Sequence, residues 1–159
     1  MIAIRPATSG DVPLILALVR ELAAYEQEPD GVTATEALLE RALFGAPALA
    51  EAAIAELDGA PVGFAVFFQN FSTWTGRASL YLEDLFVRET ARGRGAGKAL
   101  LSHLAAVALE RGCTRFEWSV LDWNRPAIDF YRAMGAEPMA EWTVQRLSGD
   151  ALVRLAGRG

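Results

Sequence analysis

Three glycines within six residues, Arg92-Gly93-Arg94-Gly95-Ala96-Gly97, lie between an apolar run and a segment rich in alanine and leucine. The run at residues 79–88 is typical of a strand, and the segment after the glycines is typical of a helix that ends at Gly112. Glycine permits backbone conformations that let successive amides point into one concavity, and the helix adds its positive end. The sequence therefore predicts a turn that binds a polyanion, with pyrophosphate as the obvious ligand. A glycine-rich turn without a ligand is the alternative.

Neither common nucleotide-binding motif fits this loop. A P-loop would have glycine at position 92 and serine or threonine after Lys98, where the chain has Arg92 and Ala99. A dinucleotide-binding fingerprint that begins at Gly93 would have glycine or alanine at position 98, where the chain has Lys98. The loop therefore indicates a phosphate site of another kind.

The remaining elements predict one central sheet with helices around it. Asp58-Gly59 is a strong hairpin signal between two apolar runs, at residues 48–57 and 62–71. Further strands are expected at residues 2–5, 79–88, 115–121 and 142–147. Helices are expected after a cap at Ser9, from a capping box of Thr33 and Glu36 to about Leu43, after the glycine loop, from the cap Asn124 to Met134-Gly135, and at residues 150–156. This order predicts a mixed α/β fold with a mostly antiparallel central sheet, as a single domain over residues 1–159.

Composition excludes several classes of protein. The 159 residues are 52% hydrophobic and 22% charged, which is typical of a domain with one core and not of a disordered chain. Twenty acidic residues against 15 basic ones argue against a nucleic-acid partner and are compatible with a cationic one. Cys113 and His103 are each the only residue of their kind, so a disulfide framework and a Cys-based or multi-His metal site are excluded.

No apolar run approaches the ~20 residues that span a bilayer, and the N-terminal residues lack the pattern of a signal peptide. We therefore expect a soluble, cytoplasmic protein with no membrane partner.

Two motifs resemble the signatures of the GNAT acetyltransferases. Arg92-x-x-Gly95-x-Gly97 resembles the Arg/Gln-x-x-Gly-x-Gly/Ala loop with which that family holds the pyrophosphate of acetyl-coenzyme A. About thirty residues later, Asn124-x-Pro126-Ala127-x-x-Phe130-Tyr131-x-x-x-Gly135 resembles the second signature, with Ala127 where the family often has serine. The resemblance runs from Ile4 to about Leu147.

Three further segments resemble the diamine (spermidine/spermine) and thialysine acetyltransferase branch. They are Ile4-Arg5-Pro6-Ala7-Thr8, Glu21-Leu22-Ala23-Ala24-Tyr25-Glu26 and Tyr81-Leu82-Glu83-Asp84-Leu85-Phe86-Val87. The resemblance implies acetyl-coenzyme A as the acetyl donor. Its cofactor-binding positions carry over to Leu85, Phe86, Val87, Arg92, Gly93, Arg94, Gly95, Ala96, Gly97, Lys98, Asn124 and Tyr131. Backbone amides near Leu85 to Val87 would polarise the thioester carbonyl, a contribution of ~100-fold or more for each donor.

Glu83 and Asp84 are adjacent carboxylates on a strand that is otherwise apolar. An alkyl amine with a pKa near ~10.4 is neutral in roughly one molecule in a few thousand at pH 7, so its attack on a thioester needs a proton acceptor. Strand alternation places the two carboxylates on opposite faces, and both reach one pocket only if the strand bulges, as the family implies. By resemblance Glu83 is the general base, acting through water, and Asp84 binds the ammonium or holds that water. Ordinary edge-strand charges are the alternative.

By resemblance Tyr131 is the general acid for the coenzyme A sulfur. Tyrosine with its ordinary pKa near ~10 is protonated at pH 7 and can donate, although a core aromatic is the alternative. Glu26 and Trp74 match positions that line the polyamine pocket of the diamine branch, and a carboxylate with an aromatic face suits an alkylammonium. A solvated helix end for Glu26 and a loop anchor for Trp74 are the alternatives.

The sequence thus predicts an acetyl-coenzyme A-dependent N-acetyltransferase. The acceptor is expected to be the primary amine of a small diamine, polyamine or thialysine-like molecule, attacking directly in a ternary complex without a metal. A non-catalytic coenzyme A sensor and a protein or peptide N-acetyltransferase are the alternatives, and the presence of both Glu83 and Tyr131 argues against the sensor. The resemblance is compatible with a homodimer, because the family is often dimeric.

Overall fold

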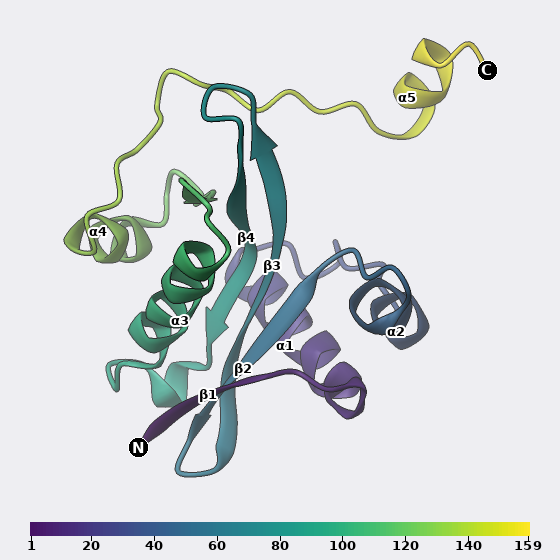
Figure 1. The fold of residues 1–159 in the computed structure, drawn as a ribbon. Coiled ribbons are helices and arrows are strands. Elements are labelled where there is room, and N and C mark those ends of the chain that lie inside the picture. The colour runs from purple at the N-terminus through teal and green to yellow at the C-terminus, as the bar shows by residue number, and fades with distance from the viewer. The chain divides into compact units, whose positions relative to one another are not determined.

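The computed structural model describes all 159 residues, which form two compact units at residues 1–121 and 122–159 (Figure 1). The first unit contains a five-stranded sheet in the order β1-β2-β3-β4-β5. Its strands are β1 (Ile2–Pro6), β2 (Glu51–Leu57), β3 (Ala60–Ser72), β4 (Arg77–Val87) and β5 (Phe116–Trp118). Strands β1 to β4 pair antiparallel, and β5 pairs parallel to β4. The expected mixed α/β fold with a mostly antiparallel sheet is confirmed.

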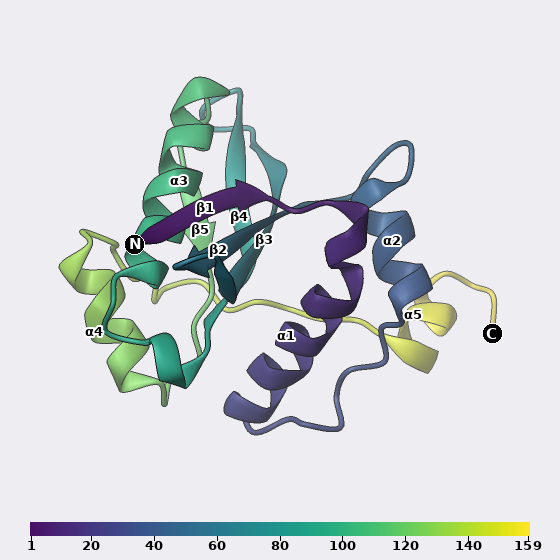
Figure 2. The same cartoon turned by 90° about the horizontal axis from the view of Figure 1, so that it is seen from below.

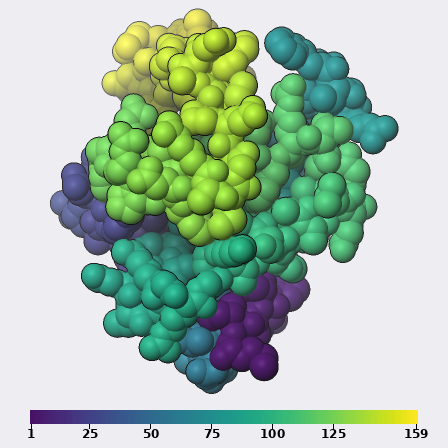
Figure 3. Space-filling view, turned by 90° about the vertical axis from the view of Figure 1, so that its left-hand side faces the viewer, coloured from purple at the N-terminus to yellow at the C-terminus, as the bar shows by residue number.

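Helices cover both faces of this sheet. Helices α1 (Val12–Tyr25) and α2 (Glu36–Phe44) lie on one face, and α3 (Ala96–Glu110) lies on the other (Figure 2). In the space-filling view the N-terminal strand, in purple, lies beside the teal and green atoms of α3 and the segment before it (Figure 3). The longest helix has 15 residues, and none has the length and apolar character needed to cross a membrane.

The core between α1 and the sheet fixes where the end of α1 lies. Ile15, Leu18 and Leu22 of α1 pack with Phe64 of β3 and Phe86 of β4 in one buried cluster. Each such side chain stabilises the fold by about 1.5–3 kcal/mol when it is removed from water. Because Leu22 and Phe86 are both in this cluster, the last turn of α1 is held against the C-terminal part of β4.

The hairpin between β2 and β3 forms as the sequence predicts. Asp58 and Gly59 occupy its two-residue turn with φ angles of 51° and 84°. Positive φ at both turn positions is the type I′ geometry, which matches the right-handed twist of the flanking strands.

Two helix starts differ from the sequence predictions. The segment expected to follow a cap at Ser9 begins as a 3₁₀ turn, Ser9–Asp11, with Thr8 as its cap, and α1 starts only at Val12. The predicted cap at Thr33 is wrong, because Thr35 caps α2 and its hydroxyl accepts a hydrogen bond from the Leu38 amide at 3.2 Å. Both threonines are suitable residue types, and the helix begins at the one whose side chain reaches the amide three residues on.

The second unit contains α4 (Arg125–Ala133) and α5 (Gly149–Leu155), close to the predicted helices. The strand predicted at residues 142–147 is wrong, since these residues have no sheet partner and Trp142 and Val144 are 70% and 81% exposed. Alternation of apolar side chains is present there, but a strand also needs an edge to pair with, which alternation does not supply. The strand predicted at residues 115–121 is also shorter, because β5 spans only Phe116–Trp118.

Candidate active site

Strand β4 has an open edge and a bulge at the same place. Strand β5 pairs with β4 from Leu80 to Leu82 and leaves it there, so the edge of β4 beyond Leu82 has no strand partner on that side. On the other side, Leu82 pairs with Phe67 and Asp84 pairs with Val66, so Glu83 is an extra residue without a partner on β3. A bulge of this kind bends the strand and disrupts alternation locally.

The bulge reverses the direction in which the backbone amides of β4 point. Before it, the Leu80 amide donates to the Arg115 carbonyl next to β5 at 2.9 Å. After it, the Arg88 amide donates to the Val62 carbonyl of β3 at 2.8 Å. Residues an even number apart on a regular strand point the same way, so the extra residue Glu83 accounts for the reversal.

The family resemblance assigns the backbone amides of Leu85, Phe86 and Val87 to the cofactor. Successive amides of a strand point to opposite sides, so the known direction of the Arg88 amide fixes the direction of these three. Those of Leu85 and Val87 point to the open edge of β4, where they can donate to a ligand. The Phe86 amide instead points to β3, and the Phe86 ring is buried in the core against α1. The open edge therefore offers donors from Leu85 and Val87 and not from Phe86.

Three carboxylates gather where the end of α1 meets the bulge. Glu26 is the first residue after α1, and Glu83 and Asp84 are on β4. Burial, and to a lesser extent the negative charges of Glu83 and Glu26, raises the pKa of Asp84 from 3.8 to about 6. Burial also raises the pKa of Glu26. A site of this kind favours a cation, because a positive charge among the carboxylates relieves their repulsion.

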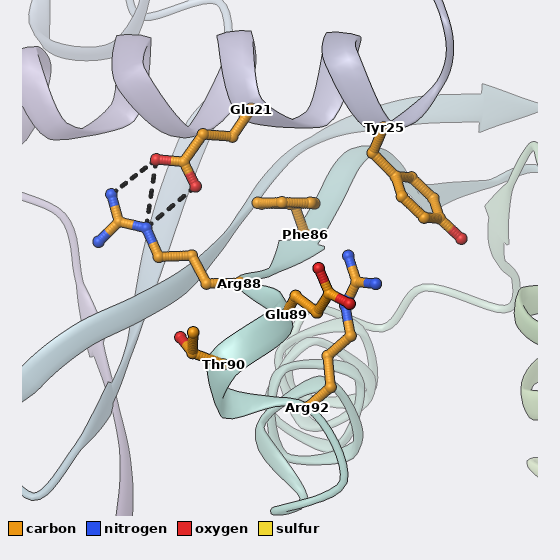
Figure 4. A pocket seen from close by; sticks show the side chains of 7 residues that line it. All are labelled: Glu21, Tyr25, Phe86, Arg88, Glu89, Thr90 and Arg92. Carbon is orange, nitrogen blue, oxygen red and sulfur yellow. Dashed lines mark hydrogen bonds and ion pairs between the residues drawn. The ribbon is translucent and has the colours of Figure 1, made fainter.

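A pocket of about 420 Å³ lies between the last turns of α1 and the end of β4 (Figure 4). Its lining residues are Glu21, Tyr25, Phe86, Arg88, Glu89, Thr90 and Arg92. Arg88 donates to both oxygens of Glu21, at distances from 2.8 to 3.2 Å. Arg92 donates from Nε to the Val87 carbonyl at 3.0 Å, and its guanidinium lies 4.8 Å from the centre of the Tyr25 ring.

Sequence reasoning missed most of this pocket. Glu21 and Tyr25 are four residues apart and therefore share one face of α1. A carboxylate and an aromatic ring at this spacing, at the end of a mostly apolar helix, are a usable signal. The sequence indicates Arg88 only as the end of a strand, because it does not show that Glu21 lies opposite.

The glycine loop forms an open concavity at the start of α3. Gly93 and Gly95 have φ angles of 77° and 89°, and a Cβ added at either would meet no protein atom within 4 Å. The first amides of α3, from Ala96 onward, have no acceptor within the helix. Arg94 and Lys98 are exposed. Free amides, open space and two cations suit a pyrophosphate.

Asn124 and Tyr131 lie in the second unit. Asn124 directly precedes α4, and Tyr131 is within it. Asn124 is buried and caps α4, and its side-chain oxygen accepts from the Ala127 amide at 3.4 Å. Tyr131 is half-buried beside Phe130, with 5.6 Å between the ring centres. The second signature thus forms a capped helix, as the sequence predicts.

Trp74 is not brought to the carboxylates of its own chain. It lies in the tight connection between β3 and β4 and is 82% exposed. Glu83 is six residues beyond Arg77, the first residue of β4, which corresponds to about 20 Å of strand. Of the four residues predicted to bind the amine, the structure gathers Glu26, Glu83 and Asp84.

Comparisons with known proteins agree with this geometry. The acetyltransferase (GNAT) family model matches residues 15–136. Thialysine N-epsilon-acetyltransferase of Bos taurus is 39% identical over 99% of this chain and 98% of its own length. Spermidine/spermine N(1)-acetyltransferase-like protein 1 of Homo sapiens is 34% identical over 96% of this chain and 23% of that longer protein.

Among solved structures, an integron cassette protein from the mobile metagenome of V. cholerae superposes with a TM-score of 0.80 at 29% identity, covering 98% of this chain and 97% of that one. The named relatives come from the branch that the motifs at α1 and β4 predict. With a family match over most of its length, the chain belongs to the acetyltransferase (GNAT) family.

Proposed function

We propose that the protein transfers the acetyl group of acetyl-coenzyme A to the primary amine of a small cationic molecule, such as a thialysine-like amine, a diamine or a polyamine. N-acetyl transfer is the activity of its family. The observation that carries the choice of acceptor is the cluster of Glu26, Glu83 and Asp84 beside the open edge of β4. Relatives named for thialysine and for spermidine or spermine, all amines on flexible chains, support the same choice.

The donor would be held by two features of the first unit. The glycine loop and the first turn of α3 would bind the pyrophosphate through backbone amides, with Arg94 and Lys98 adding positive charge. The open edge of β4 would bind the arm that leads to the thioester. The amides of Leu85 and Val87 are then the donors nearest the reacting carbonyl, where they would stabilise its developing negative charge.

The proton transfers follow from the carboxylates and from Tyr131. The amine nitrogen attacks the thioester carbon, and the bond from that carbon to sulfur breaks. Glu83, which is exposed at the bulge, would accept the proton of the ammonium through water, and Asp84 would hold the ammonium in place. Tyr131 would donate a proton to the departing sulfur and regain one from solvent, into which the nitrogen releases its second proton as the amide forms. No covalent bond to the protein forms.

The proposal covers the chain as one N-acetyltransferase domain over residues 1–159. The family match runs through the boundary between the two units, which supports this interpretation. A cytoplasmic setting is part of the proposal and agrees with Cys113, the single cysteine, being free and buried. A homodimer remains a prediction of the family resemblance.

Release of the coenzyme A thiol, measured across a panel of acceptors, tests the proposed function. The panel holds thialysine, lysine, ornithine, a short diamine, spermidine and a short peptide with a free N-terminus. We expect thiol release well above background with at least one small amine, and little with the peptide. Release with the peptide alone would indicate a peptide N-acetyltransferase. Binding of acetyl-coenzyme A with no release for any acceptor would indicate a sensor.

A further inference from the structure

The side chain of Arg92 turns away from the glycine loop that it begins. Its Nε donates to the Val87 carbonyl at 3.0 Å, at the end of β4. Its guanidinium lies 4.8 Å from the centre of the Tyr25 ring and 5.7 Å from that of Phe86 (Figure 4). One side chain thus contacts the last residue of α1 and the end of β4, while its backbone continues into the loop.

The two aromatic contacts of Arg92 adjoin the carboxylate cluster. Tyr25 directly precedes Glu26, and Phe86 is two residues beyond Asp84 on the same side of β4. The turn that carries Glu26 is otherwise held by backbone hydrogen bonds. The amides of Glu26 and Glu28 donate to the carbonyls of Leu22 and Ala23, both at 2.9 Å. A change at Arg92 is therefore transmitted directly to the residues beside Glu26 and Asp84.

We propose that the Arg92 side chain is a positioning residue for the amine site and not a ligand of the pyrophosphate. It packs on Tyr25 and Phe86 and fixes the end of α1 against β4, which sets the spacing between Glu26 and Asp84. The phosphate loop then uses the backbone that follows Arg92, together with Arg94 and Lys98. The inference rests on the proposed function in one respect, that the amine binds at the carboxylate cluster.

The substitution Arg92→Lys distinguishes a positioning role of the Arg92 side chain from a role as a pyrophosphate ligand. Lysine keeps the positive charge that a phosphate ligand needs, but it lacks the planar guanidinium and the Nε–H group that make the observed contacts. If Arg92 positions the amine site, Arg92→Lys and Arg92→Ala should both raise the KM for the amine about tenfold, the scale of one cation–π contact with its hydrogen bond. The affinity for acetyl-coenzyme A should change by less than about threefold, because an exposed charge that does not touch the phosphates contributes little to binding.

The test combines hydrogen–deuterium exchange of the full chain with steady-state kinetics, and Arg94→Ala is the matched control. We expect Arg92→Lys and Arg92→Ala to speed amide exchange at residues 26–28, while Arg94→Ala leaves that exchange unchanged and weakens acetyl-coenzyme A binding. Thermal unfolding of each variant checks that the fold is intact.

Three outcomes decide the matter. Faster exchange at residues 26–28 with a raised amine KM supports positioning. Unchanged exchange in both Arg92 variants overturns it, and this readout needs no substrate, so it stands even if the proposed function fails. Loss of acetyl-coenzyme A affinity in Arg92→Ala that Arg92→Lys restores would also overturn it, by making the side chain a phosphate ligand.

Discussion

Asp84 has a carboxyl group in a place where ionising it is costly. Burial is the largest cause, and the charges of Glu83 and Glu26 add to it, so the pKa rises from 3.8 to about 6. A carboxyl group whose pKa is higher in the folded than in the unfolded protein opposes folding once it is ionised. That cost is complete above pH 6 and disappears as the pH falls toward 4. The negative charge of Asp84 in the site therefore lowers the stability of the folded protein at neutral pH.

Asp84→Asn should therefore stabilise the folded protein and weaken its binding of the amine. At pH 7.5 we expect an increase in the free energy of unfolding on the order of 1–3 kcal/mol, seen as a higher Tm, because asparagine removes the buried charge. The gain should shrink as the pH falls from 6 to 4, and the KM for the amine should rise at neutral pH. Thermal unfolding across this pH range measures the first effect. Asp30→Asn, at an exposed position, is the control and should leave Tm unchanged.

If Asp84→Asn lowers Tm at pH 7.5, the carboxylate makes a stabilising contact in the folded protein. The high pKa would then be the wrong account of this residue.

The hydroxyl group of Tyr131 provides a test of the proposed proton donor to the coenzyme A sulfur. Tyr131→Phe keeps the ring beside Phe130 and removes only the hydroxyl. If that hydroxyl protonates the departing sulfur, kcat should fall by about 100-fold or more. The KM for acetyl-coenzyme A should change by less than about tenfold, the scale of one neutral hydrogen bond.

The matched control for Tyr131→Phe is Tyr81→Phe, which removes a hydroxyl bonded to Ser119 at 3.1 Å. It should leave kcat close to that of the wild type. Equal rates for wild type and Tyr131→Phe would make Tyr131 a packing residue and leave protonation of sulfur to solvent.

Among the elements, the turn between β4 and α3 is the one whose backbone the proposed donor requires. Gly95 and Gly59 make a matched pair, since their φ angles are 89° and 84° and neither has a protein atom within 4 Å of an added Cβ. Alanine at either position should cost about 1–2 kcal/mol of stability through backbone strain. Only Gly95→Ala should also weaken acetyl-coenzyme A binding, by about tenfold or more, the scale of one charge-assisted hydrogen bond.

Calorimetric titration of acetyl-coenzyme A into both glycine variants measures this difference. Equal affinity in Gly95→Ala and Gly59→Ala would mean that the loop does not approach the phosphates.

Local signals predict some elements of this chain and not others. Asp58-Gly59 specifies its own turn, and the glycines before α3 specify theirs, because the required backbone angles are properties of those residues. Apolar periodicity likewise predicts α1. The bulge at Glu83 was expected only through the family resemblance, since alternation alone separates Glu83 from Asp84. The prediction of a strand at residues 142–147 is wrong because pairing depends on backbone that is distant in the sequence, which local alternation does not reveal.

For the whole molecule, the charge balance agrees with a cationic acceptor without identifying it. The chain has 20 acidic and 15 basic residues, and several of the basic ones are already paired, including Arg5, Arg88 and Arg111. The residue types of the site could be predicted from sequence, whereas the gathering of Glu26 with Asp84 depends on how the end of α1 packs against β4. The contacts of Arg92 with Tyr25 and Phe86 could not be predicted for the same reason.

The pH dependence of amine acetylation by wild type and Glu83→Gln tests whether this protein activates an amine with a carboxylate on β4. Glutamine keeps the size of the side chain and removes its ability to accept the proton. At pH 7 we predict a rate about 100- to 10,000-fold below that of the wild type, with no comparable loss of acetyl-coenzyme A affinity. The deficit should narrow as the pH rises toward the amine pKa, because the acceptor then loses its proton to solvent. A Glu83→Gln variant that matches the wild-type rate at pH 7 would contradict the account.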